Sequence, residues 1–536
     1  MLIDSKMQND TKADNGGYEI LEISKALNRN QKPLHIRSRV STSFLVDFIP
    51  THTDAEVAAI LKSLKFLERP SNLSNKLRMA LIIIDMVWRS IIVALTFTST
   101  SLLATLGYFI LNKNEENDKQ AAFGIYLMLR AILYSSVYQG VGLKMSLAAS
   151  QSVGKGDDYA QSKKLFTQAA LMYVSYMLVA YLPFLYFSRE LLTFIDMSTF
   201  IAKGYYDIAW KAVLGDIFDC IQMYLMEFCY SQRIESIFAP LTWINLVVSV
   251  GLILLLDLRY GYSLDGWIIG RTTFYMLNSI AFFVVYITQT HKDSRGFCSL
   301  TTAMKNIREF VGDGISYSIG NMMEWISFET GIFFTGLTRD TNQIAALGSL
   351  MNLSYMMTDI ASGFLIIGRT RVNYLLGAGL VKASKKMAAL ALMSCTVPAF
   401  FLGLTLFFAK DYIALLYASN DLLEKENLVR LYSIYSFFTI IELSLYLLTA
   451  LMRTANQVLF SSLAYLFIGV GGTTAICLYL YLTEQLNCKP IIMGMYATLA
   501  SASIVCLVRL FTLNWNEIDI ENADCSKLDS PGDELK

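Results

Sequence analysis

The chain has 536 residues, of which 54% are hydrophobic and 13% aromatic, and its mean hydropathy is +0.44. A water-soluble protein of this length contains fewer apolar residues and more charge than the 16% found here. Lysine plus arginine and aspartate plus glutamate both number 44, so no basic surface points to a nucleic-acid partner. His35, His52 and His291 are the only histidines and lie outside the apolar runs, which excludes a histidine-ligated metal or a histidine general base within a membrane.

Residues 1–78 form a polar N-terminal segment that we expect to be cytoplasmic and partly disordered. No secretory signal peptide is expected, because the first apolar run begins only near Leu81. Within the segment, Thr53 and Glu56 have the spacing of a capping box and precede apolar residues at helical intervals. This pattern predicts a short amphipathic helix.

Twelve apolar runs follow, each of roughly 18 to 30 residues and long enough to cross about 30 Å of hydrocarbon. Backbone amides in lipid must be satisfied within their own segment or in a closed barrel, so these runs are predicted to be helices. The predicted fold class is an all-α polytopic membrane protein with 12 transmembrane helices, which begin near residues 79, 121, 161, 203, 239, 265, 307, 342, 383, 426, 458 and 489.

A repeat divides the helices into two sets of six. The block GVGLKMSLAASQSVGKGDDYAQSKK begins at Gly140, and GFLIIGRTRVNYLLGAGLVKASKK begins at Gly363. The separation of these two glycines, which we call the repeat offset, also pairs Gly154 with Gly377 and Gly156 with Gly379. One GxG after an apolar run is typical of a turn, but its recurrence at a constant offset favours a duplicated unit. Because each block ends the second helix of its set, the copies run parallel, as in transporters with a central cleft.

The repeat predicts two pseudo-symmetric lobes. The N-lobe is expected at residues 79–290 and the C-lobe at residues 307–515, with a cytoplasmic linker at residues 291–306 and a flexible acidic tail at residues 516–536. Both termini are predicted to be cytoplasmic, because the loops that this orientation places inside carry more lysine and arginine than the loops outside.

Four spaced motifs occur in order along the chain. They are Gly140 followed by Gln151-Ser-Val-Gly-Lys-Gly; Glu324-Trp325-x-x-Phe328-Glu329; Gly363 followed by Arg371-Val and Leu-Gly-Ala-Gly; and Glu442 followed eleven residues later by Arg453. With these motifs the chain resembles the MATE (multidrug and toxic compound extrusion) transporters over nearly the whole membrane region, and the glutamate motif resembles that of eukaryotic members. The resemblance implies two lobes that alternate access by a rocker-switch motion.

Two departures from the family pattern concern acidic residues. The first helix lacks the proline and the mid-helix aspartate of many prokaryotic members, and Asp85 with Arg89 lies near its cytoplasmic end at a spacing that predicts a local ion pair. On the eighth helix, where animal members place a further acid, the chain has Asn352, and Asp359 follows about two turns later.

Glu324, Glu329 and Glu442 lie within apolar runs, where an uncompensated charge costs from about 3 to more than about 10 kcal/mol. Glu324 and Glu329 are five residues apart and point about 140° away from each other around a helix. We expect one to face the cleft and receive a cation, and the other to face the interior of the second lobe with Glu442. Burial and a like-charged neighbour favour the protonated form of a carboxyl group, so proton uptake can expel a bound cation.

These three glutamates are the predicted proton-coupling and substrate-binding residues. Other residues are expected to line the cleft: Asn321, Trp325, Phe328, Tyr317, Tyr446, Asn352 and Gln151. Aromatic rings among them can make cation–π contacts with a flat organic cation. The glycine-rich blocks are assigned a structural role through Gly140, Gly154, Gly156, Gly363, Arg371, Gly377 and Gly379.

No cofactor or metal is expected. Protons are favoured over Na+ as the coupling ion, because Na+ needs several converging oxygen ligands. Asp216 and Asp219, three residues apart on the fourth helix, are the first-lobe acids that can join such a site.

The predicted function is that of a secondary active antiporter, not an enzyme, which exports organic drugs or metabolites, with cations fitting the acids best. One alternative is Na+-coupled antiport, and another is a lipid-linked saccharide flippase with a cationic cavity, for which Arg130, Lys144 and Arg271 are available. A multispan acyltransferase is disfavoured because no histidine lies in a predicted span, and a transport-inactive sensor because all three acids are retained. We expect a monomer in the plasma membrane or a vacuolar or other internal membrane of a eukaryote, with small organic substrates and lipid as partners.

Overall fold

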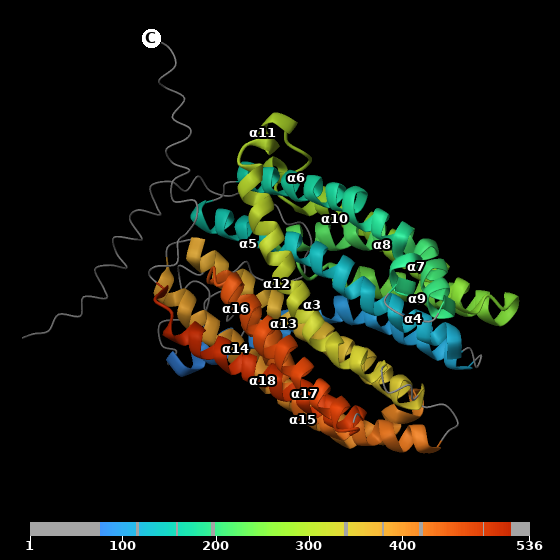
Figure 1. The fold of residues 1–536 in the computed structure, drawn as a ribbon. Helices are drawn as coiled ribbons and strands as arrows, with labels where there is room; N and C mark the ends of the chain where they lie inside the picture. The colour runs from blue at the N-terminus through green and yellow to red at the C-terminus, as the bar shows by residue number, and fades with distance from the viewer. Residues whose placement is uncertain are drawn as a thin grey trace, which may run out of the picture. The chain divides into compact units, whose positions relative to one another are not determined.

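The computed structural model describes residues 75–113, 117–156, 159–194, 199–336, 341–377, 380–417, 422–485 and 487–515. Nearly all of these residues are helical, and this part of the chain contains no strand (Figure 1). The prediction of an all-α protein is therefore confirmed. The amphipathic helix predicted near Thr53 and the tail predicted from residue 516 lie outside the described residues.

Six long helical runs form the first lobe. They are α3 (Asn75–Lys113); α4 (Asn117–Leu129), continued by η2 (Arg130–Ser135) and α5 (Ser136–Gly156); α6 (Tyr159–Tyr176), continued by η3 (Met177–Tyr181) and α7 (Leu182–Phe194); α8 (Thr199–Ser231); α9 (Phe238–Tyr260); and α10 (Ser263–Gln289). The segments η2 and η3 are short stretches of π-helix within otherwise α-helical runs. Gly261 caps the C-terminus of α9, and its φ of 65° is in the left-handed region that glycine adopts without steric cost.

A connection with a short 3-10 turn, η4 (Lys292–Ser294), and one short helix, α11 (Leu300–Met304), leads to the second lobe. Its six runs are α12 (Ile307–Gly336); α13 (Thr341–Gly377); α14 (Val381–Tyr417); α15 (Leu422–Thr454); α16 (Val458–Ala464), continued by the π-helical η5 (Tyr465–Val470) and α17 (Gly471–Leu482); and α18 (Cys488–Thr512). In Figure 1, α14 to α18 lie together in orange to red, and α4 to α10 lie together in blue to green.

The repeat seen in the sequence extends to the ends of the helices. α3 and α12 end at residues 113 and 336, α8 and α15 at residues 231 and 454, and α10 and α18 at residues 289 and 512. Each of these pairs is separated by the repeat offset, and so are the first residues of α8 and α15, Thr199 and Leu422. The prediction of two pseudo-symmetric six-helix lobes is confirmed.

Within the described ranges, nine of the helical runs are long and apolar enough to cross a membrane. The remaining three long runs are residues 117–156, α8 and α12. These three carry ionisable residues that lower their hydropathy, namely Arg130, Asp216, Asp219, Glu324 and Glu329.

The distribution of apolar and charged side chains is that of a membrane protein. Large apolar side chains face outward, for example Val179, Phe408 and Phe467, which are 78%, 70% and 69% exposed. The acids of α12 and α15 that the sequence singled out are instead buried within the helices. Lipid, unlike water, is a suitable neighbour for such an apolar outer surface.

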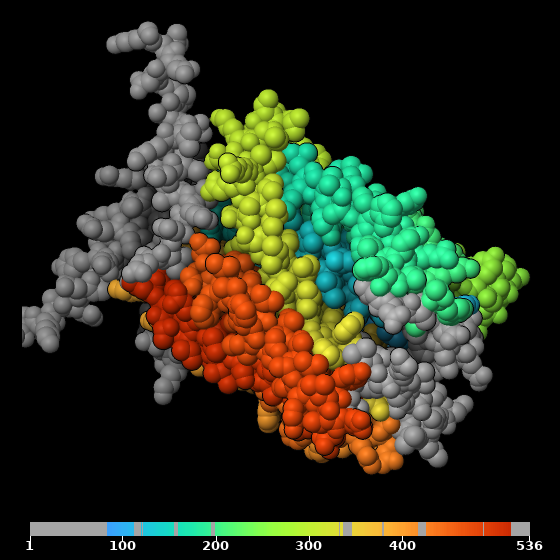
Figure 2. Space-filling view, viewed as in Figure 1, coloured from blue at the N-terminus to red at the C-terminus, as the bar shows by residue number. Residues whose placement is uncertain are grey.

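The two lobes meet along their first and second helices, and we call these contacts the lobe seam. α3 packs on α13, and α5 packs on both α12 and α13. Under the repeat, the first helix of each lobe therefore contacts the second helix of the other. Figure 2 shows α12 in yellow-green between the cyan helices of the first lobe and the orange-red α16 to α18.

Candidate functional site

The three glutamates predicted to carry function are buried in the second lobe. Glu324 and Glu329 lie on α12 and Glu442 lies on α15, and they are 3%, 3% and 2% exposed. α12 is one unbroken α-helix, so residues five apart on it point in different directions. Accordingly, Glu324 contacts α15 and Glu329 contacts α13.

Glu324 forms a buried ion pair. Its carboxylate accepts a hydrogen bond from the Arg453 guanidinium at 2.6 Å and another from the Thr449 hydroxyl at 3.3 Å. Arg453 is 6% exposed, and a guanidinium in a protein keeps its charge. The pair is therefore electrically neutral as a unit, and it ties α12 to α15.

Glu329 has a hydroxyl partner and no cation among the described residues. Its carboxylate accepts a hydrogen bond from the hydroxyl of Tyr355 on α13. Its second oxygen, Oε2, has no hydrogen-bond partner within the described residues. The Tyr355 ring in turn lies 5.5 Å from the Trp325 ring, centroid to centroid.

Glu442 is surrounded by hydroxyl groups from two other helices. Ser354 and Thr358 on α13 donate to Oε1, with the Thr358 hydroxyl at 3.4 Å, and Tyr496 on α18 donates to Oε2 at 3.4 Å. Among the described residues, no lysine or arginine forms an ion pair with Glu442 or Glu329. The second lobe thus holds one acid balanced by an arginine and two acids held by neutral donors.

The polar residues predicted to line a cleft cross the lobe seam in this conformation. Gln151 donates to Asn373 at 3.1 Å, Asn352 donates to Thr105 at 3.0 Å, and Asn321 donates to the carbonyl of Ser136 at 3.5 Å. Each of these hydrogen bonds joins a helix of one lobe to a helix of the other. A motion that separates the lobes must break them.

The aromatic residues predicted for the cleft gather near the acids of α12. Phe328 and Tyr446 are stacked, with ring centroids 6.0 Å apart and an interplanar angle of 3°. The centroid of the Trp325 ring lies 6.5 Å from that of the Tyr446 ring. Tyr317 lies elsewhere along α12 and donates to the Arg453 carbonyl at 3.2 Å. That these residues contact a substrate stays a prediction.

The glycine blocks pack the lobes against each other. A Cβ atom at Gly154 would lie 2.4 Å from the carbonyl oxygen of Tyr374, and one at Gly377 would lie 2.3 Å from that of Gln151. Gln151 and Tyr374 are themselves separated by the repeat offset, so the repeat makes these two contacts equivalent. Only residues without a side chain allow this approach. Gly156 ends α5, and Gly379 lies outside the described residues.

Ion pairs also join α13 to two other helices of the first lobe, α3 and α8. The local pair predicted between Asp85 and Arg89 is present, with 3.1 Å between Oδ1 and Nε. Arg371 joins it from α13 by donating to the other oxygen of Asp85. Also on α13, Arg369 contacts both carboxylate oxygens of Glu227 on α8, at 2.6 and 2.5 Å. Two arginines of the second lobe are thus bound by two acids of the first.

The first lobe contains a buried charge cluster that we did not predict as one unit. Asp216 on α8 accepts hydrogen bonds from Arg130 at 2.9 Å and from Arg271 at 2.6 Å. Asp219 accepts from Arg130 and, at 3.0 Å, from Gln222. The signal was ionisable residues in the apolar runs of the second, fourth and sixth helices. The sequence analysis relates the two aspartates to a Na+ site and the two arginines to a pyrophosphate site. In the structure the aspartates and arginines pair with each other.

Asp359 on α13 is a further acid at the lobe seam. It accepts a hydrogen bond of 2.5 Å from Ser101 on α3. No group of three or more histidine, cysteine, aspartate or glutamate side chains arranged to hold a metal ion occurs in the part of the chain that the structure describes.

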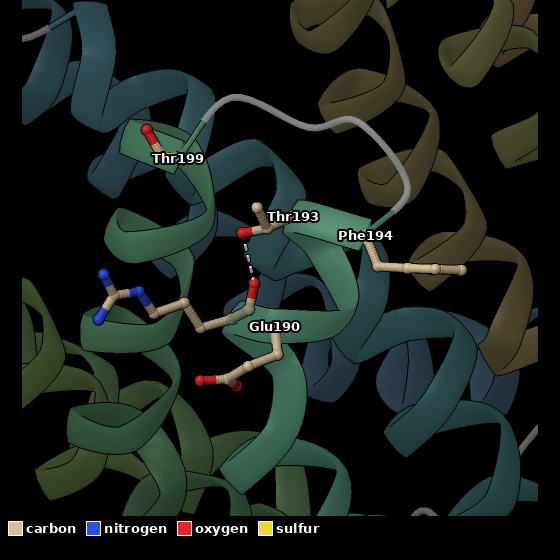
Figure 3. Close-up of a pocket in the computed structure, with 5 residues that line it drawn as sticks. Glu190, Thr193, Phe194 and Thr199 are labelled. Carbon is tan, nitrogen blue, oxygen red and sulfur yellow. Dashed lines mark hydrogen bonds between the residues drawn. The ribbon is translucent and has the colours of Figure 1, made fainter.

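The pocket in Figure 3 lies at the ends of α7 and α8, and its volume is about 460 Å³. It is lined by Arg189, Glu190, Thr193, Phe194 and Thr199. The Thr193 hydroxyl donates to the carbonyl of Arg189 within α7, and all five lining residues are exposed. Neither the three glutamates nor their hydrogen-bond partners line this pocket, so we assign it no function.

No model of a known protein family matches the chain, and none of the curated proteins does. Solved structures do match. The crystal structure of the eukaryotic MATE transporter AtDTX14 aligns with a TM-score of 0.71 at 15% identity, covering 81% of this chain and 98% of that chain. The chain has the MATE fold.

Two other structures with the MATE fold extend this comparison. An outward-facing multidrug resistance MATE family transporter of the MOP superfamily aligns with a TM-score of 0.67 at 12% identity, covering 81% of this chain and 96% of its own. A MOP superfamily transporter from Pyrococcus furiosus, described as having a binding pocket of reverse polarity, aligns with a TM-score of 0.65 at 14% identity, covering 80% and 94%. The MATE resemblance inferred from the sequence motifs is confirmed at the level of the fold.

Proposed function

We propose that this chain is a secondary active antiporter that exports small organic cations in exchange for protons, acting as a monomer in the plasma membrane or an internal membrane. The observation that carries the proposal is the environment of Glu329 and Glu442. Both are buried in long helices of a MATE fold, and neither has a cation partner among the described residues. Ionisable residues inside membrane proteins are rare, and they commonly mark ion or substrate pathways.

The chemistry of exchange follows from the cost of a buried carboxylate. A carboxyl group without a cation near it is stabilised either by taking up a proton or by binding a positively charged substrate. The two events exclude each other at one site. Proton binding therefore releases the cation, and loss of the proton prepares the site for the next one. The hydroxyl groups of Ser354, Thr358 and Tyr496 can act as donor or acceptor, so they can bind Glu442 in either state.

Glu324 has a different part in this proposal. Its charge is balanced by Arg453, which also fixes the position of α15 relative to α12. We assign Glu324 to positioning, so that Glu329 on the same helix keeps its contact with Tyr355 of α13. Alternating access would arise by motion of the lobes about their seam, because the polar contacts there can exchange with water when the lobes part.

Na+ coupling is the second candidate, and one observation favours it. The groups described as bonding to the Glu442 carboxylate are hydroxyl oxygens, which are the type of ligand that a hard cation prefers. The flippase alternative has less support. Arg130 and Arg271 are bound to Asp216, and Lys144 forms an ion pair with Asp313, so these cations are already engaged and less available to a pyrophosphate group.

The test uses proteoliposomes, an imposed pH or Na+ gradient, and a panel of fluorescent organic cations and anions. Glu442→Gln is expected to abolish uptake driven by the pH gradient at unchanged protein yield. The matched control is Glu426→Gln, the same substitution on the same helix at an exposed ion pair with Arg430. Full pH-driven activity of Glu442→Gln would contradict proton coupling at this residue, and uptake driven by Na+ alone would favour the second candidate.

A further inference from the structure

The repeat relates one buried acid of each lobe to the other. Asp219 on α8 and Glu442 on α15 are separated by the repeat offset, which also separates the first and the last residues of these two helices. Each acid is 2% exposed. Asp219 and Glu442 therefore occupy equivalent places in the two lobes.

Helices that are equivalent in the two lobes supply the partners of these acids. In the second lobe, α13 supplies Ser354 and Thr358 to Glu442. In the first lobe, the corresponding second run supplies Arg130, at the start of the π-helical segment η2, to Asp219. Neutral hydroxyl groups in one lobe are thus replaced by a guanidinium in the other.

The sixth helices differ in the same way. In the second lobe, α18 supplies the hydroxyl of Tyr496 to Glu442. In the first lobe, α10 supplies Arg271, which donates to Asp216 one turn before Asp219. Arg130 contacts both aspartates, so two guanidinium groups balance two carboxylates. The first-lobe cluster is neutral as a whole, and the Glu442 site is not balanced by any arginine or lysine among the described residues.

Other titratable groups surround Asp219, and the two charged ones within its own lobe, Arg271 and Asp216, are paired with each other. The uncharged ones are Tyr134, Tyr138, Tyr173, Cys220 and Tyr275, which are buried and close enough to interact electrostatically with it. From the other lobe, Asp359 on α13 is also within electrostatic range, and its carboxylate is bound by Ser101. Arg130 is therefore the group in direct contact with Asp219 whose charge decides whether its carboxylate is compensated.

We propose that Arg130 permanently fills a proton site of the first lobe that is equivalent to the Glu442 site, and so confines proton exchange to the second lobe. The guanidinium cannot deprotonate in a protein and is tethered to η2, so it acts as a cation that never leaves. The proposal rests on the proposed function only in taking Glu442 as the site that exchanges. Removing Arg130 should turn Asp219 into a second exchanging acid.

The experiment counts protons bound by the purified full-length protein in detergent between about pH 5 and about pH 9, the range in which buried carboxyl groups titrate. Arg130→Met keeps an apolar stem of similar length and removes the charge. We expect this variant to bind one more proton than the parent protein, and Arg130→Met/Asp219→Asn to bind the same number as the parent. An unchanged count in Arg130→Met, or an extra proton that persists in the double variant, would overturn the proposal.

Thermal unfolding provides a second measurement should Arg130→Met be unstable. An uncompensated carboxyl group takes up a proton in the folded state at a pH where it is already ionised in the unfolded chain, so the folded state loses stability relative to the parent as the pH rises. We expect the midpoint deficit of Arg130→Met to grow with pH and to disappear in the double variant. A deficit that is equal at every pH and is not relieved by Asp219→Asn would contradict the proposal.

The same titration separates this inference from the proposed function. Glu442→Gln should bind one proton fewer than the parent, whether or not Arg130 is present. If Glu442→Gln changes nothing while Arg130→Met still gains a proton, then proton exchange at Glu442 is wrong, and the inference that Arg130 fills a first-lobe site stands.

Discussion

Gly363→Ala adds one methyl group where α13 crosses α3. The new Cβ atom would lie 2.1 Å from the carbonyl oxygen of Ser90 and 2.6 Å from the amide nitrogen of Ala94. Ordinary contact distances begin at 3.4 Å, so the carbonyl oxygen is too close by about 1.3 Å. Because both atoms belong to the backbone of α3, rotation of a side chain cannot relieve the clash. The two helices must move apart.

The expected cost is the difference between two effects. Overpacking that shifts the backbone costs about 1 to 3 kcal/mol or more, and the higher helix propensity of alanine returns about 1 kcal/mol. A clash between two backbones lies at the upper end of the overpacking range, so we expect Gly363→Ala to lower the free energy of unfolding by about 2 kcal/mol or more. The assay is the thermal midpoint of the purified protein in detergent.

The matched control is Gly348→Ala on the same helix, where no atom lies within 4 Å of the new methyl group. This variant should be as stable as the parent or more so. Gly140 is the repeat equivalent of Gly363, and a Cβ atom there would lie 2.5 Å from the backbone of Ser318 on α12, so Gly140→Ala should behave like Gly363→Ala. Equal midpoints for Gly363→Ala and Gly348→Ala would refute the close crossing of α3 and α13.

Substitutions at three further contacts test the buried polar interactions by the same assay. Arg369→Glu and Glu227→Arg should each lower the unfolding free energy by about 3 to 5 kcal/mol, because each leaves two like charges buried together. The protein with both substitutions should recover much of the loss, because the pair of opposite charges is restored. If it recovers nothing, the two residues do not interact across the lobe seam. Arg453→Met should lower the unfolding free energy by a similar amount, because it leaves the Glu324 carboxylate buried without a cation. Arg453→Met/Glu324→Gln should lower it by less, because both charges are removed. Equal losses in the two variants would contradict the ion pair. Tyr355→Phe should lower the unfolding free energy by about 1 to 3 kcal/mol, since Glu329 loses its hydrogen-bond donor. The control is Tyr412→Phe at a residue that is 75% exposed, which should change the unfolding free energy by less than about 0.5 kcal/mol. If both phenylalanine variants are as stable as the parent, the contact of Tyr355 with Glu329 is excluded.

Much of the fold could be predicted because the signals are local or periodic. A bilayer requires helices of a set length, so apolar run lengths predicted the long helices and their order. The constant offset between the blocks at Gly140 and Gly363 predicted two lobes, and it recurs in the ends of the helices. Asp85 and Arg89 are four residues apart on one helix, so their ion pair needed no information beyond α3 itself.

The partners of the buried acids could not be predicted in this way. Glu324 and Arg453 are 129 residues apart, and the sequence placed Arg453 in a motif with Glu442, eleven residues earlier on the same helix. Residues eleven apart on a helix are about three turns apart along its axis, too far for direct contact. The packing of α12 on α15 therefore decided that Arg453 balances Glu324, while Glu442 is left to hydroxyl groups of α13 and α18.

The sequence by itself determined that the chain crosses a membrane as helices in two repeated lobes and that acids lie inside those helices, because length, hydropathy and repetition are properties of the chain alone. Only the tertiary structure decided which acids are compensated. Arg130 reaches Asp219 across 89 residues of sequence, and the equivalent acid in the other lobe receives no arginine from the described residues. The reason is that the state of a buried charge depends on the groups that neighbouring helices place beside it, and those neighbours are set by packing.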